Sequence, residues 1–176
     1  MLSETYPDAH CELDFDSPFE LLQATVLSAQ CTDARVNMVT PVLFGRWPSP
    51  ADLAGADRAD LEEVIKSTGF FRAKVNSLLG LSQAIVEDYD GEVPGTLPEL
   101  VALPGVGRKT ANVVLGNAFG VPGITVDTHV GRLSRRLAFT VHDDPVKVEH
   151  DLMELWPAPD WTQWCHVLIW HGRRRC

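Results

Sequence analysis

Residues 97–129 read LPELVALPGVGRKTANVVLGNAFGVPGITVDTH, and this stretch decides the fold class. Apolar residues recur at helical spacing on both sides of a Leu-Pro-Gly-Val-Gly turn, which predicts two helices joined by a tight hairpin. Gly105 and Gly107 let the backbone turn sharply and approach a neighbour closely. The first N–H groups of the second helix lack partners within that helix, so they point toward a negative ligand. The hairpin therefore predicts a site for a phosphate, bound without base preference.

Helical spacing continues outward in both directions from this hairpin. Asp16 or Ser17 can cap a helix, with Glu20 three residues after Ser17 in a capping-box arrangement. Thr32 and Asp33 begin the next helix, which Pro41 is expected to kink or split. Thr96 to Glu99 forms a second capping box, and Asp127 is expected to cap a later helix. No alternating run is long enough for a convincing strand. The sequence predicts an all-α fold with about nine or ten helices.

The charge of the chain is unevenly distributed. The 176 residues are 45% hydrophobic and 22% charged, as in an ordinary globular protein, with a net charge of −9. Residues 1–65 account for −9, whereas residues 103–136 carry five basic groups against Asp127 alone, a net charge of +4. Because a local patch decides which partner is attracted, a nucleic acid is compatible with this composition.

Composition also bears on the compartment. No apolar run approaches the roughly 20 residues that span a bilayer. The four cysteines are too widely spaced for a disulfide framework, which favours a reducing, intracellular compartment.

Lys109 and Asp127 are the candidate chemical groups. Lys109 lies in the first turn of the second hairpin helix, where the helix dipole disfavours an ammonium; a neutral amine there could attack an electrophilic carbon. Asp127, eighteen residues later, caps a helix as an ionised carboxylate and could relay protons. Alternatively, Lys109 is a surface lysine that pairs with phosphate, and Asp127 only caps its helix, which stabilises the fold by about 1 kcal/mol.

LPGVGRKTANVV followed by VDTH closely resembles the endonuclease III group of DNA glycosylases with abasic-site lyase activity. The resemblance covers essentially the whole chain, including SPFELLQATVLSAQCTD (17–33), TGF (68–70), GEVP (91–94) and LIWHGRRRC (168–176). It implies a six-helix barrel over residues 11–121, with the helix–hairpin–helix motif at 97–119. It also implies a second helical lobe, which carries an iron–sulfur cluster in the family, formed by residues 1–10 and 122–176.

The resemblance implies base-excision repair of oxidised pyrimidines in duplex DNA. Lys109 would form a Schiff base with the sugar, β-elimination would cut the strand 3′ to the site, and Asp127 would be the partner carboxylate. The damaged nucleotide must first leave the base stack. Gln30 matches the residue that fills the vacated space, and Phe70 matches an apolar wedge that is usually smaller, with a core aromatic as the alternative. The remaining implied DNA contacts are Gly105, Val106, Gly107, Arg108, Thr128 and His129.

The resemblance also implies a [4Fe–4S] cluster, held in the family by four cysteines spaced C-x6-C-x2-C-x5-C. Cys176 matches the first of them, and this chain stops there. One thiolate cannot hold such a cluster, so we expect that the cluster does not assemble in the chain as it stands. A zinc site from Cys165, His166 and His171 is conceivable, but their positions do not converge on one helix face, which favours packing.

Two other functions remain open from the sequence. A non-catalytic helix–hairpin–helix DNA-binding module would have no reason to keep both Lys109 and Asp127. A mismatch adenine glycosylase lacks the lysine and carries a catalytic glutamate where residues 23–26 read QATV. We expect damaged double-stranded DNA as the partner, no membrane, a monomer, and a bacterial cytoplasm with its nucleoid. The preferred lesions and the coupling of base removal to strand cleavage are not predicted.

Overall fold

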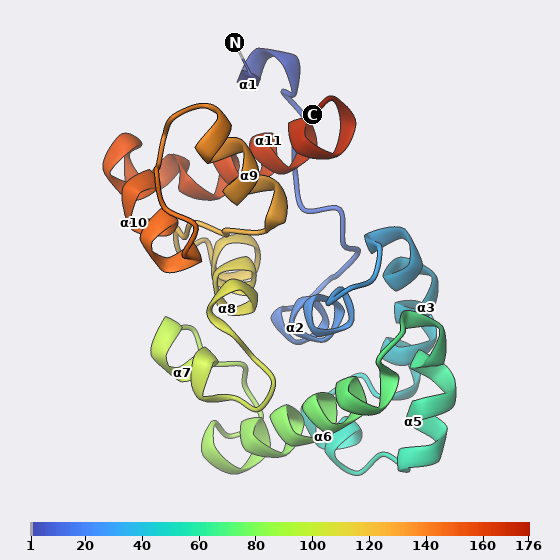
Figure 1. Cartoon of the computed structure of the whole chain (residues 1–176). Coiled ribbons are helices and arrows are strands. Elements are labelled where there is room, and N and C mark those ends of the chain that lie inside the picture. Colours follow the sequence, from blue (N-terminus) through green and yellow to red (C-terminus); the bar gives the residue numbers. More distant parts are fainter. Residues whose placement is uncertain (1) are drawn as a thin grey trace. The chain divides into compact units, whose positions relative to one another are not determined.

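The computed structural model describes residues 2–176, and every regular element among them is a helix (Figure 1). The all-α prediction is therefore confirmed. The described residues divide into two compact units. The central unit is Glu12–Val114, and the terminal unit joins the residues up to Cys11 with Leu115–Cys176. The sequence placed the corresponding boundaries at residues 11 and 121.

The central unit is built around the long helix α6, which packs against α2, α4 and α5, while α2 also packs against α3 and α8. The largest of its fully buried side chains come from α2 to α7, which gives the unit its own apolar core. The elements are α2 (Pro18–Leu27), α3 (Asp33–Arg46), α4 (Pro50–Ala54), α5 (Arg58–Ile65), the 3₁₀ helix η1 (Lys66–Thr68), α6 (Phe71–Asp88), α7 (Leu97–Ala102) and α8 (Arg108–Val114). The buried side chains are Leu21, Leu22, Leu27, Leu43, Leu53, Leu61, Ile65, Leu78, Leu81, Ile85 and Leu100.

The terminal unit has a separate core, in which α11 packs against α9 and against α1. The second hairpin helix is α-helical only to Val114. It continues as a π-helical turn, η2, which belongs to the terminal unit. The elements are α1 (Leu2–Thr5), η2 (Leu115–Phe119), α9 (Thr128–Arg136), α10 (Pro145–Leu155), the 3₁₀ helix η3 (Ala158–Asp160) and α11 (Trp161–Arg174). The core residues are Ile124, Val130, Leu133, Val148, Leu152, Cys165 and Leu168.

Most predicted helix starts are confirmed, and the predicted side-chain cap at Thr96 is wrong. The Ser17 hydroxyl accepts the Glu20 N–H at 3.2 Å, and the Thr32 hydroxyl accepts the Arg35 N–H at 3.3 Å. Thr96 makes no side-chain cap; its hydroxyl donates to the Glu99 carboxylate at 2.5 Å instead. Pro41 does not split α3, which runs through it. Because Pro41 is exposed, water can solvate the carbonyl that loses its partner.

Candidate nucleic-acid interface and active-site residues

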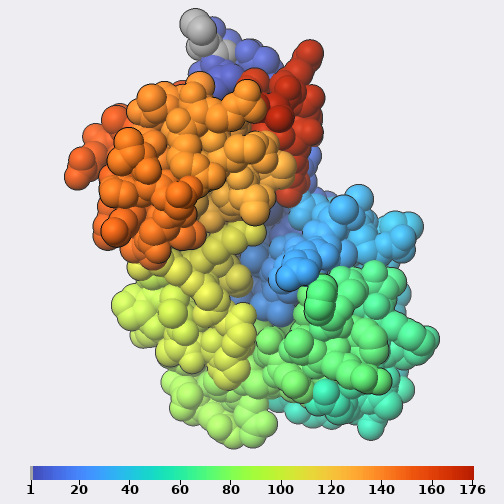
Figure 2. Space-filling model, in the orientation of Figure 1, coloured from blue at the N-terminus to red at the C-terminus, as the bar shows by residue number. Residues whose placement is uncertain are grey.

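The hairpin between α7 and α8 depends on Gly105 for two reasons. Its φ is +76°, and a Cβ there would lie 2.3 Å from Ser77 Oγ and 2.4 Å from Ser77 Cβ on α6. The left-handed backbone and the close approach both require glycine. A Cβ at Gly107, by contrast, would meet nothing within 4 Å. Gly107 therefore leaves open surface beside the turn, and the yellow-green hairpin segment lies at the surface of the central unit in Figure 2.

The residues that follow the turn differ in what they can offer a ligand. Val106 is buried, and its N–H donates to the Leu103 carbonyl at 3.1 Å, so that group already has a partner within the turn. Arg108 is half-buried, and Lys109 is exposed in the first turn of α8. The Ala111 N–H donates to the Gly107 carbonyl at 3.0 Å, which makes this the first helical bond of α8. Backbone N–H groups before that bond have no partner within the helix.

Gln30 and Phe70 come from turns that are far apart in the sequence but border the same hollow. Both have left-handed backbones, with φ of 53° and 48°, and the Phe70 side chain is 67% exposed. A cavity of about 200 Å³ is lined by both residues together with Gly105 and the α6 residues Lys74 and Ser77. The central unit therefore brings together three of the sequence-predicted DNA contacts. An exposed aromatic in a strained turn is not a core aromatic, so the structure contradicts that alternative for Phe70.

Asp127 lies in the terminal unit as the N-cap of α9. Its Oδ1 accepts the Val130 N–H at 2.7 Å, as predicted. The segment before it is fixed by the Thr125 N–H, which donates to Cys165 Sγ at 3.1 Å. Burial raises the pKa of the Cys165 thiol to about 12, the Thr125 hydrogen bond opposes that change, and nearby Asp127 and Glu149 add to it. Cys165 is therefore a neutral packing and positioning group beside Asp127, not a thiolate.

His129 is held in one tautomer by α9 itself. Its Nδ1 lies 3.2 Å from Arg132 Nη2, which also donates to the Gly172 carbonyl at 3.1 Å. Because a guanidinium only donates, Nδ1 must be the acceptor, and the ring proton of a neutral His129 is assigned to Nε2. A Cβ at Gly172 would lie 2.9 Å from His129 Nδ1, so glycine is also required there. His129 is half-buried, and its neighbour Thr128 is exposed.

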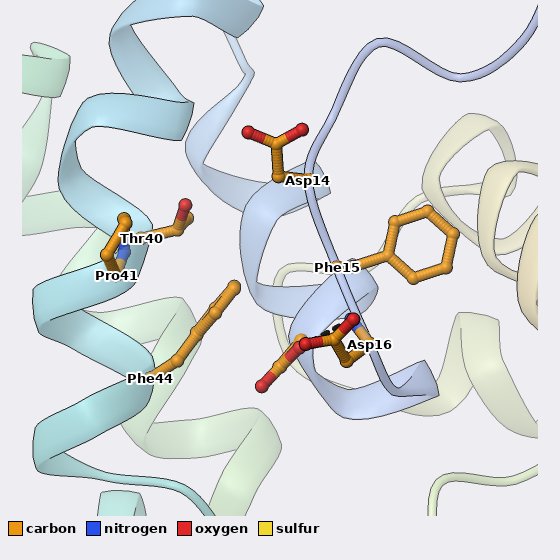
Figure 3. A pocket seen from close by; sticks show the side chains of 7 residues that line it. Asp14, Phe15, Asp16, Thr40, Pro41 and Phe44 are labelled. Atoms are coloured by element: carbon orange, nitrogen blue, oxygen red, sulfur yellow. Dashed lines mark hydrogen bonds between the residues drawn. The ribbon is translucent and has the colours of Figure 1, made fainter.

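A second cavity of the central unit does not suit DNA. It has a volume of about 330 Å³, and Asp14, Asp16 and Glu20 lie around it. Phe44 points from α3 into the space beside the segment that carries Asp14 and Asp16 (Figure 3). No lysine or arginine lines this cavity, and its carboxylates would repel phosphate.

The residues that hold these turns in place were not predicted from the sequence. Lys74 and Ser77 on α6 support the three turns of the central unit, and Arg132 orients His129. The sequence contained a sign that Lys74 is buried, because helical spacing places it on the same face as Leu78, Leu81 and Ile85. A lysine in a buried stripe indicates a partner.

Comparison with known proteins gives the family. The profile described as "HhH-GPD superfamily base excision DNA repair protein" matches residues 23–158. The chain is 55% identical to Endonuclease III of Synechocystis sp. over 177 residues, covering 100% of this chain and 81% of the relative. It is 50% identical to Endonuclease III of Bacillus subtilis, covering 99% of this chain and 80% of the relative.

The chain belongs to the endonuclease III family.

Solved structures agree with this endonuclease III assignment. A non-covalent Endonuclease III–DNA complex matches with a TM-score of 0.96 and 49% identity, covering 99% of this chain and 82% of that chain. A trapped covalent Endonuclease III–DNA intermediate matches with the same TM-score and identity, covering 99% of this chain and 83% of that chain. A thermostable thymine-DNA glycosylase, at 19% identity and a TM-score of 0.85 over 98% of this chain, shares the fold.

Within residues 2–176, the four cysteines are free and are not grouped as ligands of a four-thiolate cluster. Cys176 is exposed, and its Sγ accepts Arg136 Nη1 at 2.9 Å. Within residues 2–176, no three or more His, Cys, Asp or Glu side chains are grouped so as to hold a metal ion. The side chains of the conceivable zinc site have separate partners: Cys165 binds Thr125, His166 binds Asn117, and His171 binds Tyr6.

No helix in the described part of this endonuclease III family member has the length and apolarity to cross a membrane.

Proposed function

We propose that this chain removes oxidised pyrimidines from duplex DNA and cuts the strand at the resulting abasic site, with Lys109 as nucleophile and Asp127 as partner carboxylate. The family of the chain supports base-excision glycosylase and lyase activity. The observation that carries the residue assignment is the exposed amine of Lys109 in the first turn of α8, directly after the Gly105–Gly107 turn. A phosphate on that turn would bring deoxyribose within reach of the amine.

The chemistry follows from these groups. The neutral amine of Lys109 attacks C1′ as the C1′–N bond to the base breaks, and the base leaves with a proton. Ring opening gives an imine between C1′ and the amine. Loss of a C2′ proton then breaks the C3′–O bond, and the 3′ phosphate leaves. Water finally hydrolyses the imine and restores Lys109.

Asp127 is suited to the proton transfers in this sequence. Its Oδ1 serves the helix cap, so Oδ2 is the oxygen proposed to hold and move protons. The ionised carboxylate would also stabilise positive charge that develops at C1′ as the base departs. The fixed tautomer of His129 would present an N–H donor beside it.

The contacts with DNA are proposed as two sets. Gly105, Gly107 and Arg108 would hold the backbone through N–H groups and charge, and Gln30 and Phe70 would enter the duplex beside the extruded nucleotide. Thr128 and His129 would contact the strand from α9. We propose that the protein acts as a monomer on damaged DNA in a bacterial cytoplasm.

A mismatch adenine glycosylase is not favoured. It needs a carboxylate in residues 23–26, where Gln23 is fully buried and the Thr25 hydroxyl donates to the Leu21 carbonyl at 2.7 Å.

The test is base release from a duplex that carries thymine glycol, measured separately from strand cleavage. Lys109→Gln should bind abasic duplex and leave it uncut, while Lys147→Gln on α10, an exposed lysine, should behave as the parent. Parental strand cleavage by Lys109→Gln would refute the assignment.

A further inference from the structure

Lys74 is a buried cation whose ammonium group joins two distant backbone segments. Lys74 is 5% exposed, and its Nζ donates to the Leu27 carbonyl and to the Thr68 carbonyl, each at 2.8 Å. Burial lowers the pKa of Lys74, and nearby Cys31 opposes this change. Placing an ammonium in the interior is costly unless it is hydrogen-bonded, so these bonds are not incidental.

Both carbonyls end a helix. Leu27 is the last residue of α2, and Thr68 is the last residue of η1. The last carbonyls of a helix have no partner within it, and the C-terminal end carries a partial negative charge. Lys74 therefore satisfies the ends of two helices with one positive group.

The two helix ends lead directly into the turns that carry Gln30 and Phe70. Gln30 follows Leu27 by three residues, and Phe70 follows Thr68 by two. Both residues have positive φ, a conformation that costs a non-glycine residue about 1–3 kcal/mol and persists only where the surroundings impose it. The Lys74 hydrogen bonds supply that constraint on the chain just before each strained residue.

The hairpin rests on the next turn of the same helix. Ser77, three residues after Lys74, contacts Gly105. Pro104 packs closely against Gly80, since a Cβ added at Gly80 would lie 3.1 Å from Pro104 Cβ. One face of α6 thus supports three turns, and Lys74 also lines the cavity that Gln30, Phe70 and Gly105 border.

We infer that Lys74 is a positioning residue that sets the distance between the Gln30 and Phe70 turns, and thereby lets both side chains enter the duplex together. This inference rests on the proposed function, in which these residues open the DNA. Lys74 does not act on the DNA itself, because its ammonium is buried and directed at two backbone carbonyls.

The test replaces Lys74 by methionine, which keeps the length of the side chain and removes its donors. The probe is a duplex with a tetrahydrofuran abasic analogue opposite 2-aminopurine, whose fluorescence rises when it unstacks. Anisotropy of a labelled duplex checks that the DNA is fully bound. Lys66→Met is the matched control, since Lys66 lies on η1 with a side chain that is 62% exposed.

Lys74→Met should bind the duplex within about twofold of the parent, lose most of the fluorescence rise, and release thymine glycol about 10- to 100-fold more slowly at saturating DNA. Lys66→Met should match the parent in all three measurements. If Lys74→Met does not fold by circular dichroism, Lys74→Gln, which retains a shorter donor, should show the same defect to a smaller degree.

A parental fluorescence rise and turnover in any folded Lys74 variant would overturn the inference. Failure of the proposed function would look different, because the parent protein itself would then form no borohydride-trapped adduct with abasic DNA, whatever the Lys74 variants do.

Discussion

Exchanging the two hairpin glycines for alanine separates what the fold needs from what DNA binding needs. At Gly105, alanine would adopt a φ of +76°, which costs about 1–2 kcal/mol for an L-residue. Its Cβ would also lie 2.4 Å from Ser77 Cβ and 3.3 Å from Ser77 Cα, so the helix backbone limits how far Ser77 can move. Overpacking of this kind costs about 1–3 kcal/mol. We therefore expect Gly105→Ala to lower the free energy of unfolding by about 2–5 kcal/mol.

Gly107→Ala is the matched control for stability. A Cβ there meets nothing within 4 Å, and φ is not positive, so the free energy of unfolding should change by less than about 0.5 kcal/mol. The methyl group would, however, occupy the surface where a phosphate is proposed to approach, and losing one charge-assisted hydrogen bond weakens DNA binding about tenfold or more. Urea unfolding and DNA anisotropy measure the two effects on the same samples.

The cause of the Gly105 effect can be isolated with Ser77→Gly, which removes the Oγ and Cβ contacts but leaves the positive φ. In a double-mutant cycle, Ser77→Gly should recover about 1–2 kcal/mol in the Gly105→Ala background. Equal destabilisation by both glycine substitutions, or no coupling between Gly105→Ala and Ser77→Gly, would refute the packing argument.

Three further predictions concern the charges and the buried thiol. Asp127→Asn should keep the α9 cap and most DNA affinity but slow base release about 100-fold or more, and a parental rate would contradict its role. The folded protein holds the pKa of Cys165 at about 12, above its ordinary value of 9.0, so the stability from the neutral thiol is full below pH 9 and is lost as pH rises toward 12. Compared with Cys165→Ala, the parent should therefore show an added loss of up to about 1.4 kcal/mol per pH unit in urea unfolding over that range; parallel curves would contradict it. The logarithm of the DNA-binding constant should fall steeply and linearly with the logarithm of salt concentration, because phosphate contacts release counterions, and a flat response in anisotropy titrations would oppose the hairpin assignment.

The sequence predicted features whose causes are local. Helix caps at Ser17, Thr32 and Asp127 could be predicted because the capping side chain and the N–H that it accepts lie three residues apart. Gly105 could be predicted because the turn itself requires a left-handed residue. The all-helical fold followed from periodicity, which most of the chain shows.

What the sequence did not predict depends on partners that lie far away in the chain. Lys74 binds the Leu27 carbonyl 47 residues away, and no local pattern marks a backbone carbonyl as its acceptor. Thr96 has the spacing of a capping box, but its hydroxyl binds the Glu99 carboxylate in preference to the backbone. Pro41 is tolerated within α3 because that side of the helix is exposed, which the sequence alone does not state.

Lys109 is the amine proposed to bond covalently to deoxyribose. Lys74 is the internal control, since burial lowers its pKa but its ammonium is directed at two backbone carbonyls, so no adduct is expected there. The direct measurement is borohydride reduction of the protein with abasic duplex, followed by peptide mass mapping of the adduct. We predict a sugar adduct on Lys109 that is absent from Lys109→Gln. An adduct that maps to another lysine, or one that persists undiminished in Lys109→Gln, would contradict the assignment of Lys109.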